Sequence, residues 1–185
     1  MEKILVLAYP GSGKTELESR YENVIDFEHQ DFRYVYDESI RHLPLELRKG
    51  STDLRKDNPE WPENFLMNAL KELNEGKIVV SPFVRTVYEA YNSEYFKEKA
   101  KEVQTILVCP RLNEFEDYIE RFKKRGNSDN FIARRKSEIA AVIELFENAR
   151  DCQKIVLESG QYLAEALEKY GIELNKKKLT LNRNN

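Results

Sequence analysis

Residues 8–15 decide the fold: they read Ala-Tyr-Pro-Gly-Ser-Gly-Lys-Thr, follow an apolar run at 4–7 and precede a helix-compatible segment at 16–21. A strand, a glycine-rich turn, Gly-Lys-Thr and a helix, in this order, form the arrangement that a phosphate-binding loop needs. Gly11 and Gly13 leave the main chain free to curl, so that successive N–H groups point at phosphate oxygens. The stretch therefore predicts a phosphate-binding loop, with a chance glycine turn as the alternative.

The loop also carries the side chains that a bound nucleoside triphosphate requires. Lys14 is predicted to reach the β- and γ-phosphates, and the Thr15 hydroxyl to hold Mg²⁺. The helix that follows adds unpaired N–H groups at its start. Ala8 stands where the full pattern has its first glycine, a position at the exit from the strand. We therefore expect ATP and Mg²⁺ as cofactors, with the phosphates bound by Gly11, Ser12, Gly13, Lys14 and Thr15.

The composition suits a soluble globular protein of one domain. The chain has 185 residues, 41% hydrophobic and 34% charged, which is enough for one sizeable core. Its formal net charge of −3 does not favour nucleic-acid binding. No apolar run approaches the roughly 20 residues that span a bilayer, and the first strand begins too early to leave room for a signal peptide. We expect a cytoplasmic protein without nucleic-acid or membrane partners.

Cysteine and histidine usage points to no metal or disulfide framework. Cys109 and Cys152 lie beside or inside apolar runs, so both are expected to be buried free thiols. His29 and His42 are too scattered to propose a metal site.

Short apolar runs alternate with helical segments along the chain. Strands are predicted at 4–7, 23–27, 77–81, 103–109 and 154–157, and helices at 63–75, 84–101 (broken near Asn92-Ser93), 112–122, 131–149 and 161–170. Residues 40–64 predict short helices and loops, and 175–185 a frayed basic tail. Such alternation predicts right-handed β-α-β crossovers and a parallel sheet of about five strands with helices on both faces.

The carboxyl ends of these strands are the expected ligand site, because the phosphate loop lies at that edge. The loop alone lacks the positive charge that phosphoryl transfer demands. Arginines follow the strand ends or surround a charged turn at 125–130, and we list them as candidates for this role: Arg33, Arg85, Arg111, Arg121, Arg125, Arg134 and Arg135. The alternative for any one of them is a solvated surface side chain.

Several of these segments resemble the nucleoside monophosphate kinases of the adenylate and uridylate kinase group. The match lies in Pro-Gly-Ser-Gly-Lys at 10–14, in Asp-Phe-Arg at 31–33, in Ser-Pro-Phe-Val-Arg at 81–85 and in the charged stretch at 120–135. The chain is also similar to small phage and bacterial proteins of this superfamily described as nucleotide kinases.

This resemblance implies a three-layer P-loop NTPase fold in one domain over 1–174, with an acceptor-binding insertion at 31–64 and a short lid at 121–135. It makes Arg33 and Arg85 acceptor-phosphate ligands and Arg134 and Arg135 lid residues. Lys14, Arg121 and Arg125 would act on the transferring phosphoryl group. The implied activity is ATP-dependent phosphoryl transfer to a nucleotide or nucleoside.

One departure from the family concerns the metal. Ser81 stands where the family carries a strand-end acid that holds Mg²⁺ through water. Asp26 and Glu28, after the second strand, can take over, as the Asp-x-Asp of shikimate-type kinases does; there, an acid also orients the substrate hydroxyl and takes its proton. The alternative for Asp26 is a carboxylate that caps a turn. Phe83 is predicted to stack on an acceptor base, with a core position as its alternative.

Three functions therefore stay open. The first is the nucleotide kinase, and the second is a kinase for a small hydroxyl compound with Asp26 as the orienting acid. The third is a non-catalytic ATP-binding switch or partner-binding module, which the absence of an acid at Ser81 keeps open. A mechanical ATPase or GTPase is disfavoured, because it needs an acid on the neighbouring strand for Mg²⁺ and a base-reading motif, and neither is found. Residues 40–64 and 125–130 are predicted to be the mobile parts that exclude water during transfer.

Overall fold

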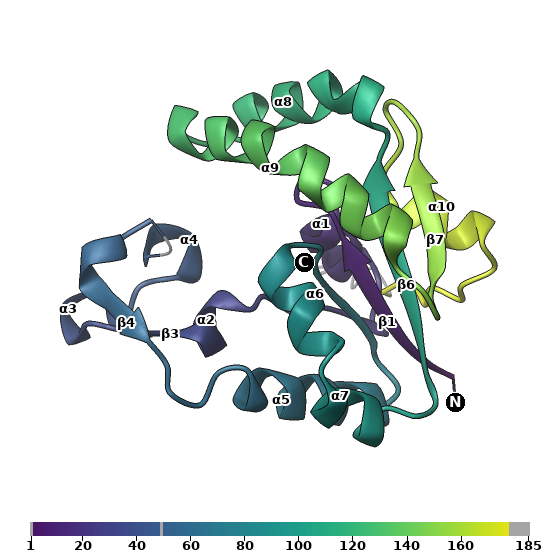
Figure 1. Cartoon of the computed structure of the whole chain (residues 1–185), viewed down its shortest axis with the longest axis horizontal. Helices are drawn as coiled ribbons and strands as arrows, with labels where there is room; N and C mark the ends of the chain where they lie inside the picture. Colours follow the sequence, from purple (N-terminus) through teal and green to yellow (C-terminus); the bar gives the residue numbers. More distant parts are fainter. Residues whose placement is uncertain (1, 49, 178–185) are drawn as a thin grey trace, which may run out of the picture.

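A five-stranded parallel sheet forms the centre of the computed structural model, which describes residues 2–48 and 50–177 (Figure 1). The strand order is β2-β5-β1-β6-β7. Its members are β1 (Lys3–Ala8), β2 (Val24–Asp26), β5 (Ile78–Pro82), β6 (Val103–Pro110) and β7 (Gln153–Leu157). The order places β1 between β5 and β6, so the loop that follows β1 leaves from the middle of the carboxyl edge. The predicted α/β class and parallel sheet are confirmed.

The two faces of β1 enter two separate cores. Leu5 and Leu7 pack on one face, whereas Ile4 and Val6 pack on the other, and each is less than a tenth exposed. Because helices cover both faces, the central strands are nearly continuous apolar runs rather than alternating ones. For this reason, the positions of the central strands could be predicted from the apolar runs in the sequence.

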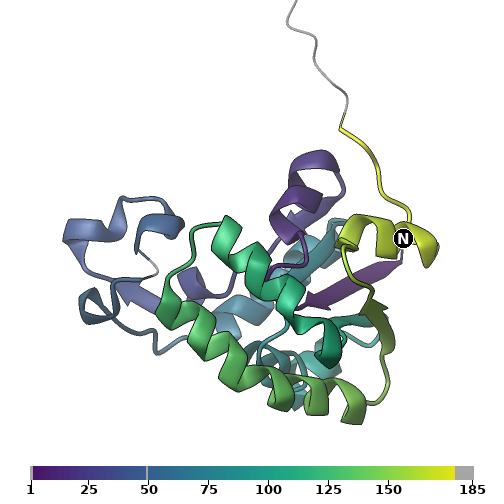
Figure 2. The same cartoon turned by 90° about the horizontal axis from the view of Figure 1, so that it is seen from above.

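Helices form the two outer layers (Figure 2). One core packs α5 (Glu63–Asn74), α6 (Arg85–Tyr91), α7 (Glu94–Lys99), α8 (Phe115–Lys124) and α9 (Asp129–Asn148) against the sheet, and the other packs α1 (Lys14–Arg20) and α10 (Leu163–Lys169). The break predicted at Asn92-Ser93 separates α6 from α7, where the Ser93 hydroxyl accepts from Phe96 N and caps the second helix. The three layers are thereby confirmed.

The insertion after β2 contains a small sheet that the sequence did not reveal. It runs through α2 (Gln30–Arg33), β3 (Tyr34–Tyr36), α3 (Glu38–Arg41), α4 (Leu45–Arg48), the 3₁₀ turn η1 (Thr52–Leu54) and β4 (Arg55–Asp57), and β3 pairs antiparallel with β4. Figure 1 shows it projecting to the left of the main sheet. Arg48 joins its parts, with Nη1 2.8 Å from Asp31 Oδ1 and the guanidinium over the Tyr36 ring.

The region predicted as a lid is a helical hairpin. The short 3₁₀ turn η2 (Leu112–Glu114) leads into α8, and the turn at 125–128 ends where Ser128 accepts from Phe131 N and caps α9. The expected charged turn is therefore two residues shorter than predicted.

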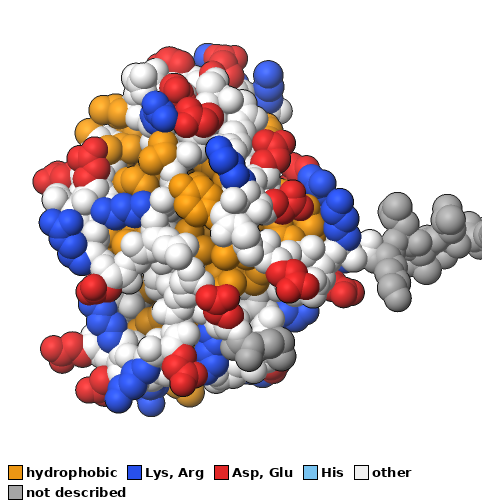
Figure 3. All heavy atoms as spheres, turned by 90° about the vertical axis from the view of Figure 1, so that its right-hand side faces the viewer, with side chains coloured by type: hydrophobic (Ala, Val, Ile, Leu, Met, Phe, Trp, Pro, Cys, Tyr) orange, Lys and Arg blue, Asp and Glu red, His pale blue; other side chains and the backbone are white. Residues whose placement is uncertain are grey.

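The end of the described chain is paired, which differs from the expectation of fraying from residue 175. Glu22 N donates to Asn175 O, and Lys177 N donates to Arg20 O. Residues 178–185 of the predicted tail lie outside the described residues. At the opposite sheet edge, β7 leaves Val156 39% exposed, and the face seen from that side shows hydrophobic side chains bordered by charged ones (Figure 3).

Two further expectations concern buried groups and the membrane. Cys109 and Cys152 are free thiols, and burial raises the pKa of Cys109 to about 12. Cys109 is buried as expected, whereas Cys152 is only partly buried. Within residues 2–48 and 50–177, no helix combines the length and the apolar character needed to cross a bilayer.

Candidate functional site

The loop between β1 and α1 has the geometry of a phosphate cradle. Gly11 and Gly13 have φ of +85° and +99°, in the left-handed region that favours glycine. Lys14 opens α1 and is only 8% exposed, while Ser12 is fully buried. A Cβ added to Gly11 would lie 2.8 Å from Cε1 of Phe122. The predicted residues therefore come together as a tightly packed turn at the start of a helix.

Side chains from α8 and the chain before α10 hold this loop in place. Arg121 donates from Nη1 to Gly11 O at 3.3 Å and from Nη2 to Gln161 O at 3.1 Å. Its guanidinium lies 4.6 Å from the centre of the Tyr118 ring and 4.3 Å from that of Tyr162. The structure thus places Arg121 against the main chain of the loop, and its predicted catalytic role stays a prediction.

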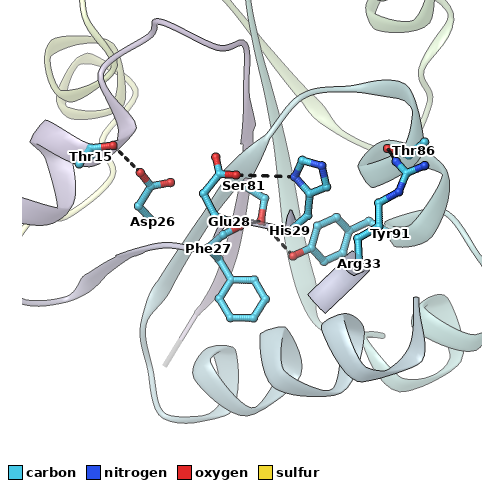
Figure 4. Close-up of polar contacts among 9 residues, drawn as sticks. All are labelled: Thr15, Asp26, Phe27, Glu28, His29, Arg33, Ser81, Thr86 and Tyr91. Atoms are coloured by element: carbon cyan, nitrogen blue, oxygen red, sulfur yellow. Dashed lines mark hydrogen bonds and ion pairs between the residues drawn. The ribbon is translucent and has the colours of Figure 1, made fainter. Parts of the chain in front are cut away.

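Thr15 and Asp26 meet beside the cradle, although they come from different strand–helix units. Thr15 Oγ1 donates to Asp26 Oδ2 at 2.7 Å (Figure 4). Within the part of the chain that the structure describes, the buried Oδ1 of Asp26 has no hydrogen-bond partner. Glu18 Oε1 accepts from Asp26 N at 3.2 Å and so fixes the end of β2. A hydroxyl and a carboxylate with a spare oxygen are oxygen ligands of the kind that Mg²⁺ prefers.

Ser81 is engaged in the core. Its hydroxyl donates to Phe27 O at 3.0 Å and lies 3.1 Å from the Tyr91 hydroxyl (Figure 4). Burial raises the pKa of Tyr91 above its usual range. Ser81 therefore ties the end of β5 to the end of β2, and the acid that contacts Thr15 is Asp26.

His29 is a site residue that the sequence analysis passed over. It lines the cleft described below, and its Nδ1 lies 3.7 Å from Glu28 Oε2. Burial, followed by the positive charges of Arg33, Lys14, Arg135 and Arg134, lowers the pKa of His29 from 6.5 to about 3. The imidazole is therefore neutral at pH 7. Its position three residues after the strand-end Asp26 was the one available signal.

A cleft of about 1790 Å³ opens at the carboxyl edge of the sheet. Pockets for one small ligand usually measure about 300–1,000 Å³, so this cleft has room for a nucleoside triphosphate and a second molecule. Its lining includes the phosphate loop, Asp26, Glu28 and His29, the insertion residues Tyr34 and Arg55, and parts of α6, α8 and α9.

Five of the predicted arginines line this cleft: Arg85, Arg121, Arg125, Arg134 and Arg135. Arg33 is not part of the lining, although Thr86, which it contacts, is. Arg33 donates from Nη1 to Thr86 Oγ1 at 3.2 Å, and Arg85 Nη1 lies 3.7 Å from Glu89 Oε1. Arg111 instead pairs with Glu158 at 2.8 Å, away from the cleft lining. The two arginines at the start of α9 differ sharply, because Arg134 is exposed whereas Arg135 is buried.

The prediction for Phe83 is wrong. Its side chain is fully buried and packs edge-on against Tyr88 and Phe146, with ring centres 5.6 Å and 6.4 Å apart. It also makes no part of the cleft lining. Because Phe83 N donates to Ala8 O, the strand pairing of β5 with β1 continues to this residue and turns its ring into the core.

Solved structures resemble this chain at low sequence identity. The tunicamycin resistance protein of Deinococcus radiodurans superposes with a TM-score of 0.52 at 18% identity, over 95% of this chain and 99% of that one. A gluconokinase from Sinorhizobium meliloti 1021 gives a TM-score of 0.47 at 20% identity, over 90% of this chain and 87% of that one. No protein-family model and no curated protein matches the sequence. The likeness to the tunicamycin resistance protein is one of fold alone.

Proposed function

We propose that the protein is an ATP-dependent kinase that phosphorylates a hydroxyl group of a small-molecule acceptor. The observation that carries the proposal is the contact between Thr15 and Asp26 beside the glycine cradle, at the floor of a cleft with room for two ligands. A phosphate loop alone supports nucleotide binding. An acid placed against its threonine and facing the second half of the cleft supports transfer to an acceptor.

The donor nucleotide would take the phosphate-loop half of the cleft. The N–H groups of residues 11–15 and the Lys14 ammonium would hold its phosphates, since Gly11 and Gly13 keep side chains out of the cradle. Mg²⁺ would be held by Thr15 and Asp26 and would neutralise part of the phosphate charge. Phosphate oxygens and water would complete its shell, as is usual for this ion.

The acceptor would take the half lined by the insertion, α6 and α9. Asp26 is the last residue of β2 and Glu28 follows it, and both line the cleft. A carboxylate here can orient the acceptor hydroxyl and take its proton. Lys14 and the cleft arginines supply the positive charge that stabilises the transferring phosphoryl group.

A nucleoside monophosphate acceptor is the second candidate, and Arg33 favours it. Arg33 donates from Nη1 to Thr86 Oγ1, and Thr86 lines the acceptor half of the cleft. An arginine arranged in this way suits a phosphate group. The third alternative, a non-catalytic ATP-binding module, is favoured by the strand-end position of Ser81, which supplies no acid.

The test is ADP release from ATP in the presence of Mg²⁺ and one acceptor at a time. The acceptors are the common nucleoside monophosphates, the nucleosides and a set of sugars and other hydroxyl compounds. We expect turnover with a subset of these, its loss in Lys14→Ala and in Asp26→Asn, and full activity in Lys136→Ala, an exposed lysine outside the cleft lining.

The other outcomes separate the alternatives. Turnover confined to monophosphates would select the second candidate. Tight ATP binding without transfer to any acceptor would support the binding module. A wild-type protein that binds no triphosphate in the presence of Mg²⁺ would exclude all three.

A further inference from the structure

The cleft continues beyond the phosphate loop as a groove along one side of α9. Arg135, Glu138, Ala141, Val142 and Leu145 line it from α9, at spacings of three or four residues that place them on a single helix face. Val84, Arg85 and Thr86 line it from the start of α6, and α9 passes above α6 in Figure 1. We call this part the α9 groove.

The entrance of the α9 groove is polar. Arg135 is 8% exposed in its side chain, and its Nη2 lies 2.7 Å from Glu138 Oε2. The buried Nε of Arg135 has no hydrogen-bond partner within residues 2–48 and 50–177. A buried donor without a partner is costly, so an oxygen of a ligand at this entrance would gain a hydrogen bond that the protein does not supply.

Beyond Glu138 the groove is apolar. Ala141, Val142 and Leu145 follow on the same face of α9, and Val84, the residue before α6, lines the same cleft. The two charges at the entrance are already paired, since Glu138 accepts from both Arg134 and Arg135. Arg85, on the opposite wall, is next to Glu89. The inner end of the groove therefore suits an uncharged, apolar group and not a phosphate or carboxylate.

We propose that the acceptor is a neutral molecule with a hydroxyl-bearing head at the entrance of the α9 groove and an apolar arm along Ala141, Val142 and Leu145. This inference rests on the proposed kinase function and specifies its substrate class. It is supported by the fact that the α9 groove, Asp26 and the phosphate loop all line one cleft.

The test uses two adjacent alanines of α9. Ala141 lines the groove, whereas Ala140 is exposed and outside the lining. Ala141→Trp fills the groove, and Ala140→Trp adds the same side chain to the solvent face. The probes are matched pairs that differ in one apolar arm: glucose against octyl β-D-glucoside, and glycerol against 1-O-hexylglycerol. Binding is measured by calorimetry in the presence of Mg²⁺ and a non-hydrolysable ATP analogue.

In the wild type and in Ala140→Trp, we expect the member with the apolar arm to bind at least about tenfold more tightly in one or both pairs, the gain from burying about two methylene groups. In Ala141→Trp this advantage should disappear, with the affinity for the ATP analogue unchanged. If Ala141→Trp does not fold, Ala141→Leu replaces it.

Equal binding within both pairs would overturn the inference, and so would an advantage that persists in Ala141→Trp. Failure of the proposed function looks different, because the ATP analogue itself would then not bind to the wild type. When the ATP analogue binds normally, the affinity difference within each probe pair therefore tests the α9 groove separately from the proposed kinase function.

Discussion

Replacing Gly11 by alanine tests whether the phosphate loop is held in shape by its contact with α8. An alanine Cβ would lie 2.8 Å from Cε1 of Phe122, and the φ of +85° is one that an L side chain rarely adopts. Phe122 is 1% exposed, so its ring has no free space to enter. The left-handed backbone costs about 1–2 kcal/mol, and overpacking adds about 1–3 kcal/mol. We expect Gly11→Ala to lower the free energy of unfolding by about 2–5 kcal/mol.

Gly126→Ala is the matched control for the backbone part of this cost. Gly126 has a φ of +73°, but an added Cβ there would meet no heavy atom within 4 Å. Only the strain of about 1–2 kcal/mol should appear. The additional loss of unfolding free energy in Gly11→Ala, compared with Gly126→Ala, therefore measures the steric overlap with Phe122.

Urea unfolding followed by circular dichroism gives both free energies, and a double-mutant cycle with Phe122→Leu isolates the contact. In the Phe122→Leu background, Gly11→Ala should lose most of its steric excess. Mg·ATP affinity should fall in Gly11→Ala. Equal destabilisation by the two alanines, or no coupling to Phe122, would refute the reasoning.

Three further predictions concern buried polar groups. Because the pKa of His29 is about 3 in the folded protein against 6.5 unfolded, its contribution to stability is full above pH 6.5 and is lost as the pH falls towards 3. Between pH 7 and 4.5, urea unfolding should show a loss of about 2–3 kcal/mol that His29→Gln removes and His42→Gln leaves. Arg121→Lys cannot serve both Gly11 O and Gln161 O. It should cost about 1.5–3 kcal/mol in thermal unfolding and weaken ATP binding, and unchanged ATP affinity would argue against its contact with the loop. Ser81→Ala and Tyr91→Phe should each cost about 1–3 kcal/mol, with less than additive loss in the double variant if they share one hydrogen-bond network.

The strands and the phosphate loop were predictable because their signals are local. The runs at 77–81, 103–109 and 154–157 are apolar and bounded by turns, and each became a strand. The pair β3–β4 was not predictable in this way. Arg55–Asp57 is a short charged segment, and its strand exists through its register with Tyr34–Tyr36. Pairing between distant segments leaves little trace in the local composition.

The site was less predictable than the fold, since burial of a polar side chain depends on what packs over it. The motif alone identified Lys14 and Thr15, and the strand end identified Asp26. Nothing near Arg135 in the sequence distinguishes it from the exposed Arg134, although the two belong to different environments. Phe83 was assigned a ligand role because an aromatic ring near a strand end suits either a core or a platform, and the continued strand pairing decided for the core.

The parts of the cleft that can close follow from which contacts are buried. The hairpin of α8 and α9 is anchored by Phe122 under Gly11 and by the buried Ile132 and Arg135, so its movement would break core packing. The insertion is anchored much less: within its described residues from Tyr34 to Asp57, Tyr36 is the one hydrophobic side chain that is buried. Segments with little apolar burial open at low free energy.

We therefore expect closure around the ligands to come mainly from the insertion. Amide hydrogen exchange should be fast in Tyr34–Tyr36 and Arg55–Asp57 of the ligand-free protein, and should slow on addition of Mg·ATP with a bound acceptor. The amides of α9 from Ile132 onward serve as the internal control and should exchange slowly in both states. Exchange at β3 and β4 as slow as that of β1 without ligand would contradict this assignment, because it would mean that the insertion is as firmly held as the core of the sheet.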